Sequence, residues 1–300
     1  MYIGRFAPSP TGPLHFGSLI AATGSYLESR CHDGQWLLRM EDIDPPREQP
    51  GAAADILHTL ERFGFEWDGE VVYQSRRGET YEAALNHLLQ AGQLYPCTCS
   101  RKEISEHNKN STTGIVYPGT CRNPANRVAG KHFALRLRTH NHAVQFTDIL
   151  QGPYAQKLES EIGDFPLKRR DGYYAYHLAV VVDDAEQGIT HIVRGSDLLD
   201  STPRQIYLQQ LLNIPTPEYA HLPVAVNHDG QKLSKQTYAK AVDIKNASAL
   251  LWHALEFLGQ QPPAGLQYEL PGTVWNWALD HWRLKNVPKT GKIAVDENRS

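Results

Sequence analysis

Short apolar runs alternate with amphipathic stretches along the first 90 residues of the chain. The amphipathic stretch 52–63, for example, carries Ile56, Leu57, Leu60 and Phe63 at helical spacing. The pattern predicts alternating strands and helices, with strands at 2–6, 36–40 and 71–73 and helices at about 14–30, 52–63 and 81–91. Strands that alternate with helices form βαβ units on a parallel sheet. We therefore expect an α/β fold with a doubly wound, Rossmann-like parallel sheet, and a functional site at the carboxyl ends of its strands.

The pattern changes after about residue 94. A segment with three cysteines ends at Cys121, and the two stretches that follow, 133–138 and 143–148, alternate as strands do. We interpret about 95–165 as an insertion into the α/β fold. The α/β pattern then resumes with a buried helix, a strand, a second helix and a last apolar run, predicted at 174–184, 189–194, 202–212 and 222–226.

Two further helices are predicted after residue 245, at 247–258 and 274–284, with a break rich in proline and glycine between them. We assign 1–245 to one domain that contains the insertion, and 246–300 to a short helical region. No stretch approaches about 18 apolar residues, and the first residues lack the order of a signal peptide. We therefore expect a cytoplasmic protein with no membrane partner. The sequence does not reveal the oligomeric state, and a monomer is our working prediction.

Composition narrows the class of protein only slightly. Hydrophobic residues make up 41% and charged residues 21% of the chain, which is ordinary for a globular protein. The formal net charge of −3 argues against a general electrostatic clamp for nucleic acid, but not against a local basic face. The stretches 168–170 and 283–292 are candidates for RNA contact, and are equally typical of a solvated surface. Four cysteines in such a chain are not a disulfide framework.

Two short segments carry candidate chemistry. The first, 5–18, ends a strand, turns through prolines and glycine, and starts a helix near His15. A helix that begins after such a turn offers an anion site, because free N–H groups and the helix dipole point at one place. The second segment, 232–236, places two lysines and a serine in a turn after a polar loop. Donors of these kinds suit a reaction in which negative charge builds up on phosphate.

Together the two segments resemble the HIGH and KMSKS motifs of class I aminoacyl-tRNA synthetases. The match is imperfect, because Phe16 and Ser18 replace the isoleucine and the second histidine, and Gln236 ends the second motif. Ser18 still offers a hydroxyl to a phosphate. The resemblance implies His15 and Lys235 as catalytic residues, Mg²⁺ on the phosphates of ATP, and ATP contacts from His15, Gly17, Ser18, Lys232, Ser234 and Lys235.

Four runs resemble the glutamyl branch of this class, namely 5–12 (RFAPSPTG), 39–44 (RMEDID), 176–184 (YHLAVVVDD) and 192–197 (IVRGSD). Glutamate carries two carboxylates and one ammonium, so its pocket needs two cationic forks and one acid. The resemblance implies a glutamate pocket made by Arg5, Phe6, Ala7, Pro8, Ser9, Glu41, Tyr176 and Arg194. Which arginine takes which carboxylate stays open. Outside such a pocket, the arginines would be surface ion pairs and Tyr176 a core aromatic.

The cysteine segment indicates zinc. Cys97, Cys99 and Cys121 can supply three corners of a tetrahedron. Candidates for the fourth ligand are His107, Glu103 and Tyr117, and chemistry alone favours the imidazole of His107. A tyrosine four residues before the last cysteine is similar to the zinc site of the glutamyl-queuosine tRNA(Asp) synthetases, which implies Tyr117 instead. Three unmetallated thiols are the alternative.

The length of the chain also resembles that of the glutamyl-queuosine tRNA(Asp) synthetases. Full glutamyl- and glutaminyl-tRNA synthetases carry a large domain that reads the anticodon, and the 55 residues after Lys245 are too few for one. The resemblance then implies ATP-dependent activation of glutamate without tRNA, followed by transfer to queuosine at the wobble position of tRNA(Asp). Three alternatives remain: a true glutamyl-tRNA synthetase that charges tRNA(Glu), an adenylating enzyme with another acceptor, and a catalytically dead paralogue that binds tRNA.

Overall fold

The core of the protein is a set of parallel strands, shown in the computed structural model, which describes residues 1–108, 115–232 and 240–295. Strands β1 (Ile3–Phe6), β2 (Gln35–Met40) and β3 (Val72–Tyr73) pair in parallel in that order, and β9 (His191–Gly195) pairs in parallel with β10 (Glu218–Leu222). The two groups adjoin at β1 and β9, where the Thr190 N–H donates to the Ile3 carbonyl at 3.0 Å. The parallel α/β expectation is confirmed.

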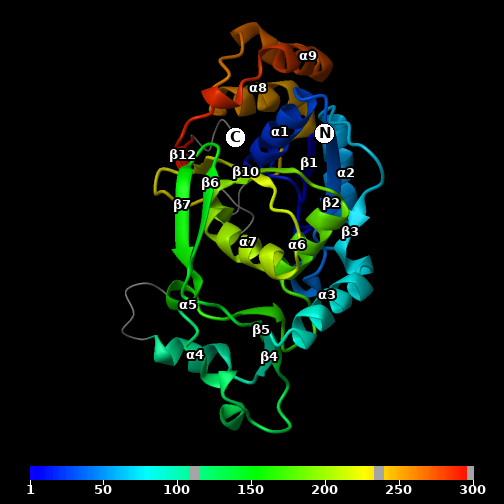
Figure 1. The fold of residues 1–300 in the computed structure, drawn as a ribbon. Coiled ribbons are helices and arrows are strands. Elements are labelled where there is room, and N and C mark those ends of the chain that lie inside the picture. Colours follow the sequence, from blue (N-terminus) through cyan, green and yellow to red (C-terminus); the bar gives the residue numbers. More distant parts are fainter. Residues whose placement is uncertain (109–114, 233–239, 296–300) are drawn as a thin grey trace.

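Helices cover these strands on both sides of the two groups (Figure 1). The helices of the α/β core are α1 (Phe16–Arg30), α2 (Ala52–Arg62), α3 (Gly78–Gln90), α6 (Tyr176–Glu186) and α7 (Thr202–Leu211). Helix α1 approaches β10 closely at Gly24, where a Cβ would lie 2.6 Å from the Leu222 side chain. A side chain at this position would have to displace the Leu222 methyl group, so glycine allows α1 to lie close to the strands that it covers.

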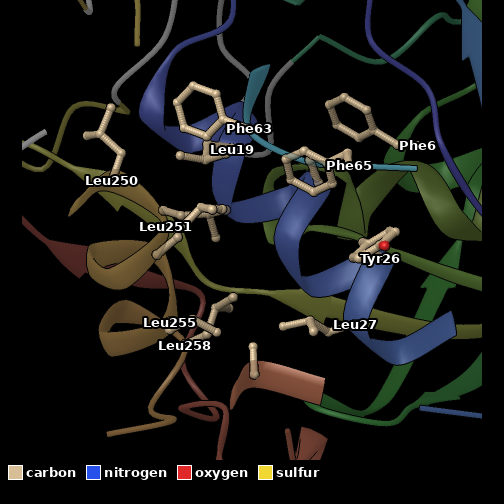
Figure 2. Close-up of a cluster of buried hydrophobic side chains, with 14 of the residues drawn as sticks. Phe6, Leu19, Tyr26, Leu27, Phe63, Phe65, Leu250, Leu251, Leu255 and Leu258 are labelled. Carbon is tan, nitrogen blue, oxygen red and sulfur yellow. The ribbon is translucent and has the colours of Figure 1, made fainter. Parts of the chain in front are cut away.

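The helices after residue 245, α8 (Ala247–Phe257) and α9 (Pro271–His281), pack on the α/β core rather than apart from it. Figure 2 shows the apolar cluster that joins them, with Leu19 and Leu27 of α1 facing Leu251 and Leu255 of α8. Trp275 of α9 completes the contact, because its indole N–H donates to the Phe63 carbonyl at 2.8 Å. The helical expectation for this region is confirmed at α8, and α9 begins three residues earlier than expected.

A strand follows these helices, so a purely helical ending was the wrong prediction. Strand β12 (Lys292–Ala294) pairs in parallel with β11 (Val224–Val226). Two backbone bonds extend the pairing, from the Val224 N–H to the Gly291 carbonyl at 3.0 Å and from the Val295 N–H to the Val226 carbonyl at 2.9 Å. The chain therefore returns to the α/β core after α9.

The region interpreted as an insertion contains two separate β structures. Strands β4 (Leu94–Cys97), β5 (Ala134–Leu137) and β8 (Phe165–Lys168) form an antiparallel sheet in the order β4-β5-β8, and helices α4 (Arg101–His107) and α5 (Leu158–Glu161) lie beside it. This sheet and α4 lie at the end of the molecule opposite α9 (Figure 1). The hairpin of β6 (Ala143–Asp148) and β7 (Gly152–Lys157) instead returns to the core, where the Ile149 N–H donates to the Tyr219 carbonyl at 2.9 Å.

Among the described residues, we find no helix that is both long enough and apolar enough to cross a membrane.

Candidate active site

One cavity of about 450 Å³ opens at the carboxyl ends of β1 and β9. It is lined by twelve of the residues predicted from the sequence: Arg5, Phe6, Ala7, Pro8, Ser9, His15, Gly17, Ser18, Glu41, Tyr176, Arg194 and Lys232. These residues come from segments up to 227 positions apart in the chain, from Arg5 to Lys232. Ser234 and Lys235 lie outside the described residues.

His15 lies at the N-terminus of α1, where the predicted anion site requires it. It is the N-cap residue, and its Nδ1 accepts from the Ser18 N–H at 3.2 Å. Its Nε2 lies 3.1 Å from the Ser18 hydroxyl. The imidazole therefore caps the helix and faces the cavity together with Ser18, where both side chains and the helix dipole favour an anion.

Arg5 enters the cavity from the end of β1 and is anchored by a buried carboxylate. Its Nε donates to Asp184 Oδ1 at 3.2 Å, and the fully buried Arg39 donates to the same oxygen at 2.8 Å. Burial opposes ionisation of Asp184, but the two guanidinium groups overcome it and hold the pKa of this carboxyl below its usual range. Asp184 is thus an anion that fixes both arginines.

Glu41 follows β2 and lies beside this charge cluster, 3.8 Å from Arg39. Burial raises its pKa to about 7, because the favourable charges of Arg39 and Arg5 offset only part of the desolvation. The carboxyl is therefore poised to lose its proton near neutral pH when a cation arrives. Its backbone N–H donates to the Pro8 carbonyl at 3.0 Å, which ties it to the strand end that carries Arg5.

Arg194 ends β9 on the other side of the cavity and is held by neutral groups. Its Nε donates to His221 Nε2 at 3.0 Å, and its Nη2 donates to Thr202 Oγ1 at 2.9 Å and to Gln205 Oε1 at 2.8 Å. Its Nη1 is buried and has no hydrogen-bond partner among the residues that the structure describes. A buried cationic donor without a partner is costly, so this end of Arg194 is where an anionic ligand would be stabilised most.

Two further predicted residues complete the walls. Tyr176 begins α6 and its ring meets that of His177 with centroids 5.4 Å apart; burial raises the pKa of its phenol, which therefore stays a hydrogen-bond donor. Lys232 forms an ion pair with Asp197 at 2.6 Å. Binding of a phosphate by Lys232 would have to compete with Asp197.

The four predicted zinc ligands lie together, away from this cavity. The Sγ atoms of Cys97, Cys99 and Cys121 all lie within 4.8 Å of one another. Tyr117 Oη lies 3.3 Å from Cys97 Sγ and 3.9 Å from Cys99 Sγ, and the Cys99–Cys121 distance is 3.5 Å. Ligands around tetrahedral zinc at about 2.3 Å from the metal are roughly 3.8 Å apart, so this donor set fits the ion.

The other two candidates for the fourth ligand are not part of this cluster. Among the described residues, the group of His, Cys, Asp and Glu that could hold a metal consists of the three cysteines and excludes His107 and Glu103. Glu103 is engaged in the capping box of α4 with Ser100. Burial and a bond from Cys97 raise the pKa of the Tyr117 phenol, whereas hydrogen bonds outweigh burial at Cys121 and lower the pKa of its thiol to about 7.

Sequence reasoning missed several residues of the site. Thr11, Asp197, Leu198 and Val224 also line the cavity. Asp197 could have been found, because it ends the run that carries Arg194. His221 carried no comparable signal, because it sits within β10, whose apolar pattern indicates only a buried strand.

The fold and the cavity are those expected of a class I aminoacyl-tRNA synthetase: a parallel α/β core with a helix N-terminus, two buried arginines and a lysine around one cavity. Residues 3–254 match the family described as tRNA synthetases class I (E and Q), catalytic domain. The fold is similar to that of glutamate-tRNA synthetase from Elizabethkingia anophelis, with a TM-score of 0.81 and 23% identity over 99% of this chain and 68% of that chain.

Relatives of similar length narrow the class to one family. A glutamyl-Q tRNA(Asp) synthetase from Neisseria meningitidis serogroup B (strain MC58) is 56% identical over 96% of this chain and 98% of its own length. One from Dechloromonas aromatica (strain RCB) is 57% identical over 98% of both chains. The chain belongs to the glutamyl-Q tRNA(Asp) synthetase family of class I tRNA synthetases.

Proposed function

We propose that the protein activates glutamate with ATP and transfers it to queuosine at the wobble position of tRNA(Asp). The observation that carries the proposal is the single cavity in which two buried arginines and the carboxyl of Glu41 face the N-terminus of α1. These groups match the charges of glutamate, and the helix N-terminus matches those of a nucleotide phosphate. The names of the relatives supply the acceptor.

Recognition of glutamate follows from the charges of the pocket. Arg5 and Arg194 would take the two carboxylates, and Glu41, once ionised, would take the ammonium. The hydroxyls of Ser9 and Tyr176 would complete the hydrogen bonds, while Phe6, Ala7 and Pro8 form the wall between them.

The nucleotide would occupy the part of the cavity near α1. His15, Gly17 and Ser18 would receive its phosphates, with Lys232 at the opposite wall. We extend the proposal to Ser234 and Lys235, which follow Lys232 in the sequence but lie outside the described residues. As in class I synthetases generally, Mg²⁺ would accompany ATP.

The reaction has two steps. An oxygen of the glutamate α-carboxylate attacks the α-phosphorus of ATP, and pyrophosphate leaves with the bonding electrons, which gives glutamyl-adenylate. A ring hydroxyl of queuosine then attacks the activated carbonyl, loses its proton, and expels AMP to leave an ester. Donors at His15 and at the lysines would stabilise the charge that grows on the phosphates in the first step.

Zinc is a second part of the proposal. Cys97, Cys99, Tyr117 and Cys121 would hold one ion between β4 and the segment after α4. A four-ligand site away from the cavity is structural in type, because a catalytic zinc keeps an open position. The ion would hold the thiols as thiolates and link β4 to the segment that carries Tyr117 and Cys121.

The RNA would approach from the side of the β4-β5-β8 sheet. A second cavity of about 430 Å³ there is lined by Lys131, His132 and the stretch 168–170. Arg169 reaches from this cavity to Asp44 at 3.0 Å, three positions after Glu41 in the chain. A cavity lined by several basic side chains suits an RNA backbone. The described residues after 245 pack on the core, which supports their assignment as something other than an anticodon-binding domain.

The proposal is tested with labelled glutamate, ATP and three separate RNAs: tRNA(Asp) that contains queuosine, the same tRNA without it, and tRNA(Glu). We expect label only on the first, and ATP–pyrophosphate exchange without any RNA. Label on tRNA(Glu) would instead establish ordinary aminoacylation. ATP–pyrophosphate exchange without label on any RNA would indicate an acceptor other than these RNAs. Absence of exchange would indicate a protein that binds tRNA without catalysis.

A further inference from the structure

Two buried polar side chains, His221 and Asp148, form a chain of hydrogen bonds that ends at Arg194. His221 of β10 is fully buried and lies between Arg194 and Asp148, with 3.0 Å from the Arg194 Nε to His221 Nε2 and 2.5 Å from His221 Nδ1 to Asp148 Oδ2. Asp148 ends β6 and is 1% exposed. These two side chains are not among those that line the catalytic cavity.

The chemistry of the three groups fixes where the histidine proton lies. The guanidinium of Arg194 can only donate, so His221 Nε2 accepts, and the proton of the neutral imidazole is on Nδ1. Nδ1–H then donates to Asp148. This carboxylate also accepts the backbone N–H groups of Leu150, Gln151 and His221 at 2.9 to 3.1 Å. Asp148 is thereby held in one orientation by β6, its turn and β10.

This chain of hydrogen bonds determines which edge of Arg194 is offered to a ligand. Its Nε and Nη2 are used by His221, Thr202 and Gln205. Arg194 lines the cavity, and its Nη1 is buried and has no hydrogen-bond partner in the described part of the chain, so this is the nitrogen that remains for a ligand. Without the acceptor at His221 Nε2, the guanidinium could rotate and Nη1 would no longer point at a fixed place.

We propose that Asp148 and His221 are positioning residues that aim Nη1 of Arg194 at a carboxylate of the amino-acid substrate. The proposal rests on the proposed function, because it takes the cavity of Arg194 to be the glutamate pocket. It assigns to the β6–β7 hairpin, which lies in the region read as an insertion, a part in amino-acid selection. Neither residue lines the cavity, so their effect is expressed through Arg194 and through Thr202, whose hydroxyl lies 3.2 Å from His221 Nε2 and accepts from Arg194.

The test is ATP–pyrophosphate exchange with glutamate and ATP varied in turn. H221L removes the acceptor at Nε2 while it keeps an apolar side chain of similar size. We expect the KM for glutamate to rise about ten- to a hundredfold, the effect of a lost hydrogen bond to a charged group, with the KM for ATP changed less than about twofold. D148N should act in the same direction, because its amide donates to Nδ1 and moves the histidine proton to Nε2, against the Arg194 donor.

Recovery of glutamate binding in a conservative variant distinguishes a positioning role of His221 from a merely structural one. H221Q places a carbonyl oxygen near Nε2, and we expect the KM for glutamate to return to within about threefold of the wild-type value. The double variant D148N/H221L should be no worse than H221L, because both act through the same bond. The matched control is H191Q on β9, a histidine outside the cavity, which should leave both KM values unchanged.

Three results would overturn the proposal: a folded H221L or D148N with an unchanged KM for glutamate, equal rises in both KM values, or an H221Q as impaired as H221L. If H221L does not fold, D148N and H221Q decide, because they preserve volume or polarity. Wild-type protein without glutamate-dependent exchange would overturn the proposed function itself, and this proposal with it. Loss of rescue in an otherwise active enzyme overturns only the positioning role.

Discussion

The two arginines of the cavity are anchored differently, and the difference matters for their electrostatics. Arg5 bonds to the carboxylate of Asp184, so part of its charge is compensated within the protein. Arg194 bonds to an imidazole, a hydroxyl and an amide oxygen, which leave its charge uncompensated in the first contact layer. A carboxylate gains more from a buried cation that has no other counter-charge. On the proposed function, we therefore expect Arg194 to contribute the larger share of the affinity for the carboxylates of glutamate.

Glu41 provides a prediction at the same scale. With a pKa of about 7, its carboxyl is largely protonated at pH 6, and an ammonium bound beside it favours the ionised form. Glutamate binding at pH 6 to 7 should therefore release between about half a proton and one proton per site. Calorimetry in two buffers of different ionisation enthalpy measures this number. In E41Q the release should vanish and binding should weaken; release that persists in E41Q would contradict the assignment.

The raised pKa of Glu41 also affects folding, because it makes the free energy of unfolding depend on pH. The folded state keeps the Glu41 proton to a higher pH than the unfolded chain, so it binds more protons between pH 4.5 and 7. The contribution of this group to the free energy of unfolding is thus complete below pH 4.5 and falls as the pH rises through about 7. If Glu41 binds the ammonium of glutamate as proposed, its burial lowers the stability of the free protein at neutral pH.

Among the elements, three of the strands that sequence analysis missed share one property. Strands β4, β7 and β8 contain Pro96, Pro153 and Pro166, and proline within an apolar run argues against a strand. In the structure all three strands have a partner on one side only, in the order β4-β5-β8 and in the two-stranded β6–β7 hairpin. An edge strand tolerates the missing N–H, but sequence does not reveal which strand is an edge.

The site was more predictable than these elements, for a physical reason. Arg5, Glu41 and Arg194 stand at or just after the carboxyl ends of parallel strands, where the fold alone brings side chains together. Asp148 and His221 were missed because they act through another side chain. Their contact joins residues 73 positions apart and depends on a hairpin that returns to the core.

The cysteine segment provides a prediction at the scale of elements. C121S should abolish bound zinc, measured as metal per chain by mass spectrometry, and lower the Tm, because metal binding and folding of such loops are coupled. C31S is the matched control, since Cys31 is exposed and its thiol contacts the Leu279 carbonyl at 3.4 Å. It should keep one zinc per chain. A C121S protein that still bound one zinc per chain would contradict the assignment of Cys121 as a ligand.

At the scale of the whole molecule, the last described strand supports the part of the cavity that we propose for the nucleotide. Strand β12 pairs with β11, whose Val224 and Ala225 line the cavity. Ser196 bonds to the Gly291 carbonyl and fixes the same segment to the loop after β9. The chain thus closes on itself beside the segment that leads to Lys232.

Removal of residues 290–300 tests this support. Val287 packs in the main apolar cluster and is retained, so we expect a folded protein with a small loss of Tm. The KM for ATP in the exchange reaction should rise about tenfold or more, as expected when supporting backbone bonds are lost, with a smaller effect on glutamate affinity. K292A is the control, because its exposed side chain leaves the backbone pairing intact. Equal losses for both substrates would show general destabilisation instead.

The pairing of β12 with β11 also means that the cavity is completed in stages while the chain is synthesised. The residues of the proposed glutamate pocket, from Arg5 to Arg194, and His221 behind Arg194 all precede residue 232. The support of β11 arrives only when 292–294 have been made. Because chains fold from the N-terminus as they emerge from the ribosome, a nascent chain can hold the amino acid before it can hold the nucleotide firmly. On the proposed function, chains whose last strand is in place would form the adenylate most efficiently.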